Sequence, residues 1–92
     1  MSDSNDFYKK LKTKLEETTD FPTEYMYKFI IPSDGEVKEL ENAFSHTGAV
    51  IKSRKSKTGK YISFTILVKM KSADSIIEKY KEVSKIKGVI SL

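Results

Sequence analysis

The side chains of this sequence that are best suited to binding a charged ligand lie in one short stretch, residues 52–61. Lys52, Arg54 and Lys60 carry positive charge there, and Tyr61 adds an aromatic ring. Cations bind phosphate groups, and aromatic rings stack on unpaired bases. The combination is typical of a surface that binds anions or single-stranded nucleic acid, so these four residues form a candidate nucleic-acid or anion-binding site.

Two further observations bear on this stretch. Lysines on the outer strand of a sheet keep it from pairing with another sheet, which is a purely structural role. RNA-recognition domains carry stacking aromatics on their third strand, and residues 57–64 match that pattern at Tyr61 and Phe64. Gly59, however, stands where a second stacking aromatic is expected. Nucleic-acid binding is therefore the alternative hypothesis and not the leading one.

A second candidate site is the loop formed by Ser33, Asp34 and Gly35. This loop precedes a stretch with helical spacing, and the N-terminus of a helix attracts anions. Ser33 and Glu36 also have the spacing of a capping box, in which each side chain bonds the backbone amide of the other residue. The loop is thus a candidate ligand-binding site, although the negative charge of Asp34 opposes an anion.

The sequence offers few groups for catalysis or metal binding. His46 is the only histidine, Arg54 is the only arginine, and cysteine is absent. A catalytic nucleophile needs a positioned base, and a zinc site needs several histidine or cysteine ligands. An acylphosphatase-like enzyme would need an arginine in residues 31–35, and none is present. We therefore expect no enzyme activity, no metal site and no cofactor.

The length and composition of the chain indicate one small domain. The chain has 92 residues and a net charge of +4, which permits an anionic partner without requiring one. The first six residues are polar and partly acidic, unlike a signal peptide, and no apolar run reaches the roughly 20 residues of a membrane span. We expect a cytoplasmic protein without disulfides or membrane attachment.

Hydrophobic spacing and turn residues predict the order β-α-β-β-α-β after an N-terminal helix. The strands are expected at residues 24–31, 49–57, 60–70 and 89–92, and the helices at residues 34–46 and after Ser72. This is the ferredoxin-like arrangement, an α+β fold with a four-stranded antiparallel sheet. Strands one and three lie in its middle, and both core helices cover one face. The domain spans residues 19–92, and residues 1–18 form the extra helix.

The strand at residues 61–70 carries the clearest pattern. Its apolar residues alternate strictly with others, which predicts one buried face. The strand at residues 24–31 is apolar on both faces, and such strands are usually covered on both sides. Either the N-terminal helix or a second subunit would have to supply the second cover.

The hairpin before this strand can adopt two registers. A two-residue turn at residues 58–59 pairs Lys52 with Thr65 and Arg54 with Ser63, which places both cations and Tyr61 on the uncovered face. A three-residue loop with a bulge shifts the pairing by one residue and turns the two cations inward. The first register buries no charge and is preferred.

The N-terminal helix has a narrow apolar stripe made of Phe7, Leu11 and Leu15. The stripe is too thin for a core helix and is typical of a helix that docks on a finished surface. That surface can belong to the same domain or to a protein partner.

Two short motifs resemble a known family. Phe21-Pro22-Thr23 followed by Tyr27-Lys28, and then residues 56–61 before the alternating strand, resemble the YbeD-like family of small bacterial proteins of unknown function. The lysine-rich sequence is similar to the sequences of members from Bacteroidetes. The family is similar to ACT-type regulatory domains, which implies a ferredoxin-like fold. It also implies a small ligand bound at a subunit interface, near the loop of residues 32–35.

These observations favour a non-enzymatic binding or regulatory module. A homodimer is expected, because the first strand is apolar on both sides and Leu67 lies on the uncovered face. The alternative is nucleic-acid binding through the basic hairpin of residues 52–61. A third hypothesis is a protein-interaction adaptor that uses the N-terminal stripe.

Overall fold

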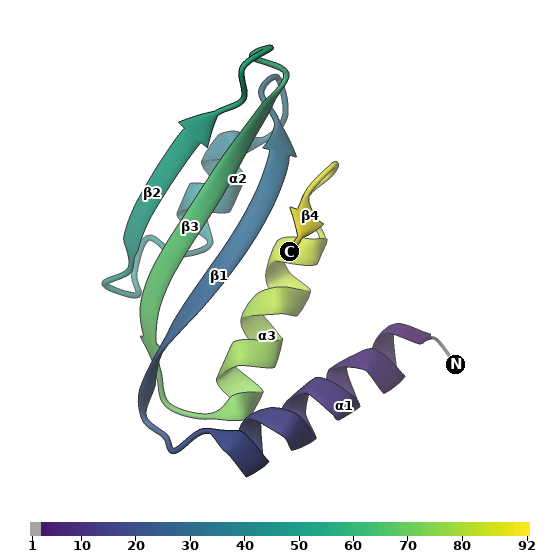
Figure 1. Cartoon of the computed structure of the whole chain (residues 1–92), viewed down its shortest axis with the longest axis vertical. Helices are drawn as coiled ribbons and strands as arrows, with labels where there is room; N and C mark the ends of the chain where they lie inside the picture. The colour runs from purple at the N-terminus through teal and green to yellow at the C-terminus, as the bar shows by residue number, and fades with distance from the viewer. Residues whose placement is uncertain (1–2) are drawn as a thin grey trace.

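The computed structural model describes residues 3–92 and shows an α+β fold (Figure 1). Its elements are α1 (Asp3–Thr18), β1 (Thr23–Pro32), α2 (Val37–Asn42), β2 (Val50–Lys55), β3 (Tyr61–Met70), α3 (Ala73–Ser84) and β4 (Ile90–Ser91). The four strands form one antiparallel sheet in the order β2-β3-β1-β4. The predicted fold class is confirmed, with the ferredoxin-like order and with β1 and β3 in the middle.

The core lies between one face of the sheet and the helices α2 and α3. Alternate residues of the two central strands point into it, because side chains in a strand change sides at every residue. The ring of Tyr27 lies at its centre, with ring centroids 4.8 Å from Tyr80 and 5.3 Å from Phe44. Other fully buried side chains are Phe29, Ile31, Leu40, Ile66, Ile76 and Val83. Burial of this apolar surface is the main stabilising contribution.

The hairpin β2–β3 has the first of the two predicted registers, which buries no charge. Lys52 pairs with Thr65 and Arg54 pairs with Ser63. The turn itself is longer than two residues, because the amide of Gly59 donates to the carbonyl oxygen of Ser56 at 2.9 Å. Gly59 has φ +75°, a conformation that glycine adopts without steric cost. The loop is longer by an even number of residues, so the faces of both strands are preserved.

The first core helix departs from its prediction. α2 covers only Val37–Asn42 instead of residues 34–46, and its N-cap Glu36 makes no side-chain capping bond. The predicted capping box is wrong, because the hydroxyl of Ser33 donates to the carbonyl oxygen of Gly59 at 2.6 Å. A Cβ on Gly35 would lie 3.0 Å from the carbonyl oxygen of Pro32. A tight turn therefore occupies the place where the first helical turn was expected.

The second core helix follows its prediction. The hydroxyl of Ser72 accepts a hydrogen bond from the amide of Ser75 at 3.1 Å, which caps α3. The ammonium of Lys79 donates to the carbonyl oxygen of Ala43 at 2.6 Å and also pairs with Glu82 at 2.9 Å. Lys79 thereby joins α3 to the end of α2.

The N-terminal helix packs on α3 and not on the sheet (Figure 1). Leu15 belongs to the core with 8% of its surface exposed, and Leu11 is half-buried against it. Lys12 pairs with Asp74 at 2.9 Å, and this pairing raises the pKa of Lys12. Phe7 remains 60% exposed. The helix therefore adds to the helical layer, and the second face of the sheet has no helix over it within residues 3–92.

The first of the two covers expected for the second face of β1, the N-terminal helix, is thus wrong, because α1 packs on α3; cover by a second subunit stays a prediction. Met26, on that second face, is 50% exposed, while Tyr27 on the first face is fully buried. None of the described helices is long and apolar enough to cross a membrane.

Candidate functional site

The candidate site lies on the face of the sheet that no described helix covers, and we call it the open face. Strand register and alternation place the following residues on it: Glu24, Met26, Lys28 and Ile30 of β1, Val50, Lys52 and Arg54 of β2, Tyr61, Ser63, Thr65, Leu67 and Lys69 of β3, and Ile90 of β4. Leu92 follows Ile90 by two residues, and its amide donates to the carbonyl oxygen of Lys28 at 2.9 Å. We count it with this face.

Large apolar side chains are exposed on the open face in cross-strand rows. Leu67 lies opposite Val50 on one side and Met26 on the other, and both neighbours are at least half exposed. Ile30 of β1 lies opposite Ile90 of β4, which is also exposed. Of the exposed large apolar side chains in the described chain, all except Phe7 lie on this face. A cluster of this kind is typical of a surface that another molecule covers.

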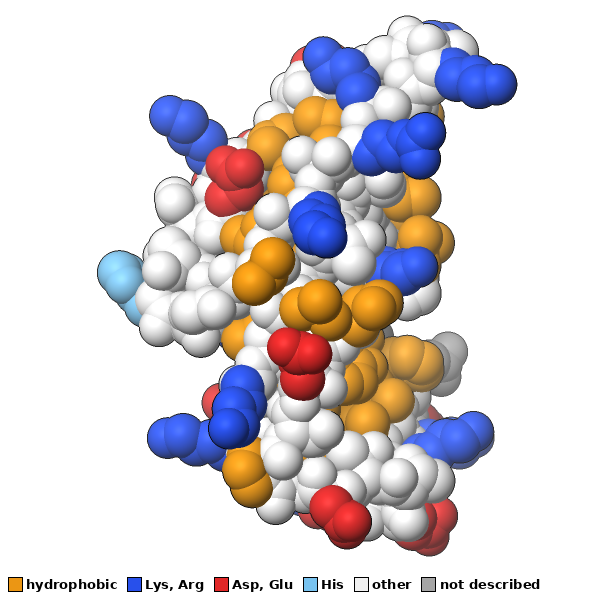
Figure 2. Space-filling model, turned by 60° about the vertical axis from the view of Figure 1, so that its left-hand side comes forward, with side chains coloured by type: hydrophobic (Ala, Val, Ile, Leu, Met, Phe, Trp, Pro, Cys, Tyr) orange, Lys and Arg blue, Asp and Glu red, His pale blue; other side chains and the backbone are white. Residues whose placement is uncertain are grey.

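Positive charge is interleaved with these apolar rows. Lys28, Lys52, Arg54 and Lys69 lie on the open face, and Glu24, which pairs across the strands with Lys69, is its only acidic residue. Among the side chains of residues 6–92, no carboxylate forms an ion pair with Lys28, Lys52 or Arg54. Figure 2, in which the left-hand side of Figure 1 comes forward, shows separate Lys and Arg side chains with hydrophobic side chains between them, and Asp and Glu side chains in the same view. The open face is therefore amphipathic and basic.

The hairpin end of the open face contains a shallow hollow of about 290 Å³. Its lining includes Ile30, Arg54, Lys57, Tyr61 and Ser63. The structure thus brings together two of the four predicted nucleic-acid or anion-binding residues. Lys52 lies further along β2, opposite Thr65, and Lys60 lies in the turn, so neither of them lines the hollow.

The other predicted site, Ser33 to Gly35, serves the fold. The hydroxyl of Ser33 donates to the carbonyl oxygen of Gly59. The backbone amide of Ser33 donates to the carbonyl oxygen of Lys60 at 2.9 Å. Both polar groups therefore hold the β1–α2 loop against the hairpin turn. The side chain of Asp34 is exposed, and α2 begins only at Val37.

Replacing Ser33 by alanine is expected to lower the free energy of unfolding by about 1 kcal/mol, the usual net contribution of one hydrogen bond. The reason is that the part-buried carbonyl of Gly59 loses its donor. Urea unfolding measures the change. Ser45→Ala is the control, because that hydroxyl bonds only the carbonyl three residues before it, on the surface. Equal effects of both substitutions would contradict the structural role of Ser33.

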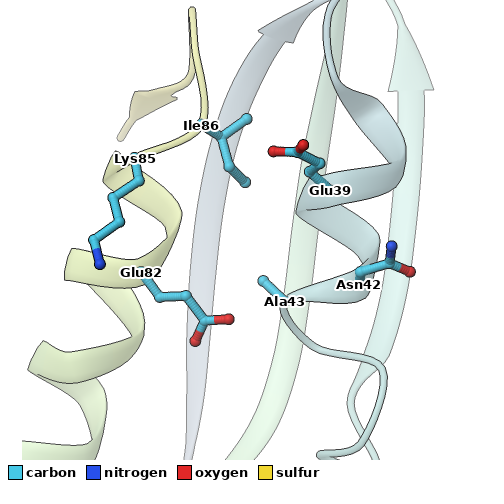
Figure 3. A pocket seen from close by; sticks show the side chains of 6 residues that line it. All are labelled: Glu39, Asn42, Ala43, Glu82, Lys85 and Ile86. Atoms are coloured by element: carbon cyan, nitrogen blue, oxygen red, sulfur yellow. The ribbon is translucent and has the colours of Figure 1, made fainter.

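A second hollow lies on the helical side, between α2 and α3 (Figure 3), and has a volume of about 280 Å³. Glu39 and Asn42 reach it from α2, while Glu82, Lys85 and Ile86 line it from the other side. The neighbouring carboxyl group of Glu36 raises the pKa of Glu39. Glu82 is already paired with Lys79. Within residues 3–92, no three His, Cys, Asp or Glu residues are grouped closely enough to hold a metal ion.

Sequence reasoning missed some apolar members of the open face. The sequence predicts Leu67 on the uncovered face and an apolar second face of β1, which includes Met26, but it does not predict the exposure of Val50 and Ile90. The preferred register already placed Val50 opposite Leu67, so that pairing was a usable signal. Ile90 could not be placed, because only the tertiary structure aligns the two-residue β4 with β1.

Comparison with known proteins assigns the chain to a family without assigning an activity. Residues 16–92 match a family described as "Protein of unknown function (DUF493)". The chain belongs to this family. No curated protein and no solved structure matches it.

The DUF493 match covers the whole sheet and both core helices, so the open face lies within the shared region. It begins at Glu16, near the end of α1. The exposed Phe7 and the half-buried Leu11 lie outside the match, whereas the open face belongs to the part of the chain that defines the family.

Proposed function

We propose that this protein is a non-enzymatic binding or regulatory module that holds a protein partner on its open face. The observation that carries the proposal is the uncovered set of aliphatic side chains around Leu67. An antiparallel sheet with one buried face normally presents polar side chains on the other. Here Met26 and Val50 are exposed instead, next to Leu67, which is half-buried.

Burial of these side chains would provide the driving force for association. Full burial of an aliphatic side chain of this size is worth about 1.5–3 kcal/mol. The core helices and α1 all lie on the other side of the sheet, so in the described chain no helix competes for this surface. The partner can therefore bind without displacing part of the protein.

Nucleic-acid binding is the second candidate. It is supported by the hollow that collects Arg54, Lys57 and Tyr61. Proteins that bind single strands combine basic grooves with several stacking aromatics, and on the open face Tyr61 is the only aromatic residue. The aliphatic rows favour the protein partner, because Met26, Val50 and Leu67 offer no ring on which a base can stack.

The resemblance to YbeD-like proteins and ACT-type domains supplies a finer proposal. It implies a regulatory domain that binds a small ligand near the β1–α2 loop at a subunit interface. The hydrogen bonds of Ser33 to the hairpin turn use the polar groups that such a ligand would need. The open face therefore has more support than this loop as the binding surface.

Photo-crosslinking in cells that make the protein tests the leading proposal. We replace Leu67 with benzoylphenylalanine, which crosslinks whatever covers the open face. The same replacement at Lys38, exposed on α2, is the matched control. We expect a crosslink to another protein from position 67 and none from position 38. A crosslink only to nucleic acid would favour the second candidate, and no crosslink from position 67 would overturn the proposal.

A further inference from the structure

We propose that the partner segment bound by the open face is an acidic amphipathic helix, whose apolar residues flank one or two carboxylates. This inference rests on the proposed function and adds the chemical class of the partner. It follows from the order of side chains across the sheet and from the charge of the face.

Three neighbouring rows that cross the strands make up the middle of the open face, with Lys69 and Glu24 beyond the first row and Tyr61 beyond the third. The first row is apolar and consists of Val50, Leu67 and Met26. The second is basic over Lys52, Thr65 and Lys28, and it ends beside the exposed Leu92. The third consists of Arg54, Ser63, Ile30 and Ile90, so it begins with a cation and ends apolar. A partner must therefore present apolar, acidic and apolar groups in that order.

The spacing of the rows matches a helix. Side chains on one face of a strand repeat about every 6.7 Å, so the apolar rows lie about 13 Å apart with the lysines midway. A helix rises about 1.5 Å per residue, so residues at i, i+4 and i+8 on one helix face span about 12 Å. An extended segment could present the same order, but its backbone groups would be buried unpaired against the sheet face. A helix satisfies its own backbone groups, so we infer the helical form.

Charge distinguishes this partner from a second copy of the chain. A symmetric dimer brings the same patch together twice. Two open faces would place Lys28, Lys52, Arg54 and Lys69 of both copies in one interface, with only Glu24 from each to offset them. Close like charges oppose association, whereas carboxylates over Lys28 and Lys52 would steer it.

A synthetic helical peptide provides the probe. It has about 18 residues, capped ends, leucines at i, i+7 and i+8, and glutamates at i+3 and i+4 on the same face. A matched peptide carries lysines at the glutamate positions. Each is titrated into the ¹⁵N-labelled full chain, and amide shifts are followed by NMR. We expect saturable shifts around Lys28, Lys52 and Leu67 with the acidic peptide only.

Exchanging the charges tests the pairing directly. In the variant Lys28→Glu with Lys52→Glu, we expect the affinity for the acidic peptide to fall at least about tenfold and the lysine peptide to bind instead. The control is Lys14→Glu with Lys38→Glu, which makes the same charge change on the exposed surface of α1 and α2. This control should bind the acidic peptide as the unmodified protein does.

Four results of the binding experiments would overturn the inference. They are equal binding of both peptides, no binding of the acidic peptide, shifts confined to the helical side, and tighter binding of a single-stranded oligonucleotide to the same residues. Shifts that change on dilution without peptide would assign the open face to a second copy and overturn it as well. A crosslink from position 67 to another protein, together with any of the four, would leave the proposed function standing and remove only the acidic helix.

Discussion

Replacement of Phe29 by alanine is expected to lower the free energy of unfolding by about 3–5 kcal/mol, the range found for removal of buried phenylalanines. Phe29 is fully buried in the central strand β1. Its ring stacks on Tyr27 with centroids 5.7 Å apart and lies 6.2 Å from the ring of Tyr80. Alanine would leave a cavity that the two packed layers cannot close. A domain of this size has only about 5–15 kcal/mol of stability in total, so much of it would be lost.

The control for this prediction is the same substitution at Phe7. That side chain is exposed on α1 and touches the ring of Tyr8 at its edge, with centroids 5.5 Å apart. Phe7→Ala should change the stability by no more than about 0.5 kcal/mol, as surface substitutions usually do. Urea unfolding followed by circular dichroism measures both variants. Similar losses at the two positions would show that the core is not where the structure places it.

The second large effect is a loss of stability at alkaline pH. Burial raises the pKa of Tyr27 well above its usual range, because the phenolate would lose its hydration, and the neighbouring Tyr80 and Tyr25 raise it further. The hydroxyl also donates to the carbonyl oxygen of Ile76 at 3.1 Å. Burial raises the pKa of Tyr80 as well, and its hydrogen bond with Tyr25 adds to the effect.

The sign of this change in stability with pH follows from proton linkage. In the unfolded chain a tyrosine ionises near pH 10, whereas folded Tyr27 keeps its proton. Above that pH the unfolded state binds fewer protons, so unfolding becomes easier as the pH rises. The stabilisation is complete below about pH 10, and the contribution of Tyr27 then falls by about 1.4 kcal/mol per pH unit.

Tyr27→Phe isolates this contribution. At neutral pH the variant should lose about 1 kcal/mol with the hydrogen bond to Ile76. Between pH 10 and pH 11.5 its stability should fall less steeply than that of the unmodified protein, and urea midpoints measure both slopes. The other side chains are the same in both proteins, so their contributions cancel in the comparison. Tyr61→Phe removes a hydroxyl from the open face and should retain the steeper slope. Parallel slopes for Tyr27→Phe and the unmodified protein would contradict the assignment.

Patterns that repeat along the chain predicted most of the fold. Strict alternation in β3 identified its buried residues, and the apolar stripe of α3 with the Ser72 cap predicted that helix. The register of the hairpin was also predictable, because the alternative would have buried charges beside Phe64 and Ile66. In each case several residues share the same preference for burial or for exposure, so a wrong interpretation of one residue does not change the prediction for the whole element.

Single local motifs were less dependable. Ser33 and Glu36 have the spacing of a capping box, yet the hydroxyl of Ser33 bonds to Gly59, which is distant in the sequence. Both arrangements satisfy the hydroxyl, and the choice between them depends on how closely the hairpin turn approaches the β1–α2 loop. The distance between the turn and the loop cannot be predicted from the residues of the loop alone.

The amino-acid sequence alone determined which strand residues are apolar, which are basic and how β2 pairs with β3. Lys52, Arg54 and Tyr61 were placed on the uncovered face on that basis, and the structure puts them there. Only the tertiary structure decided that α1 packs on α3 and that the open face is left without a helix. The reason is physical: apolarity shows that a side chain would gain by burial, and the packing of the other elements decides whether anything covers it.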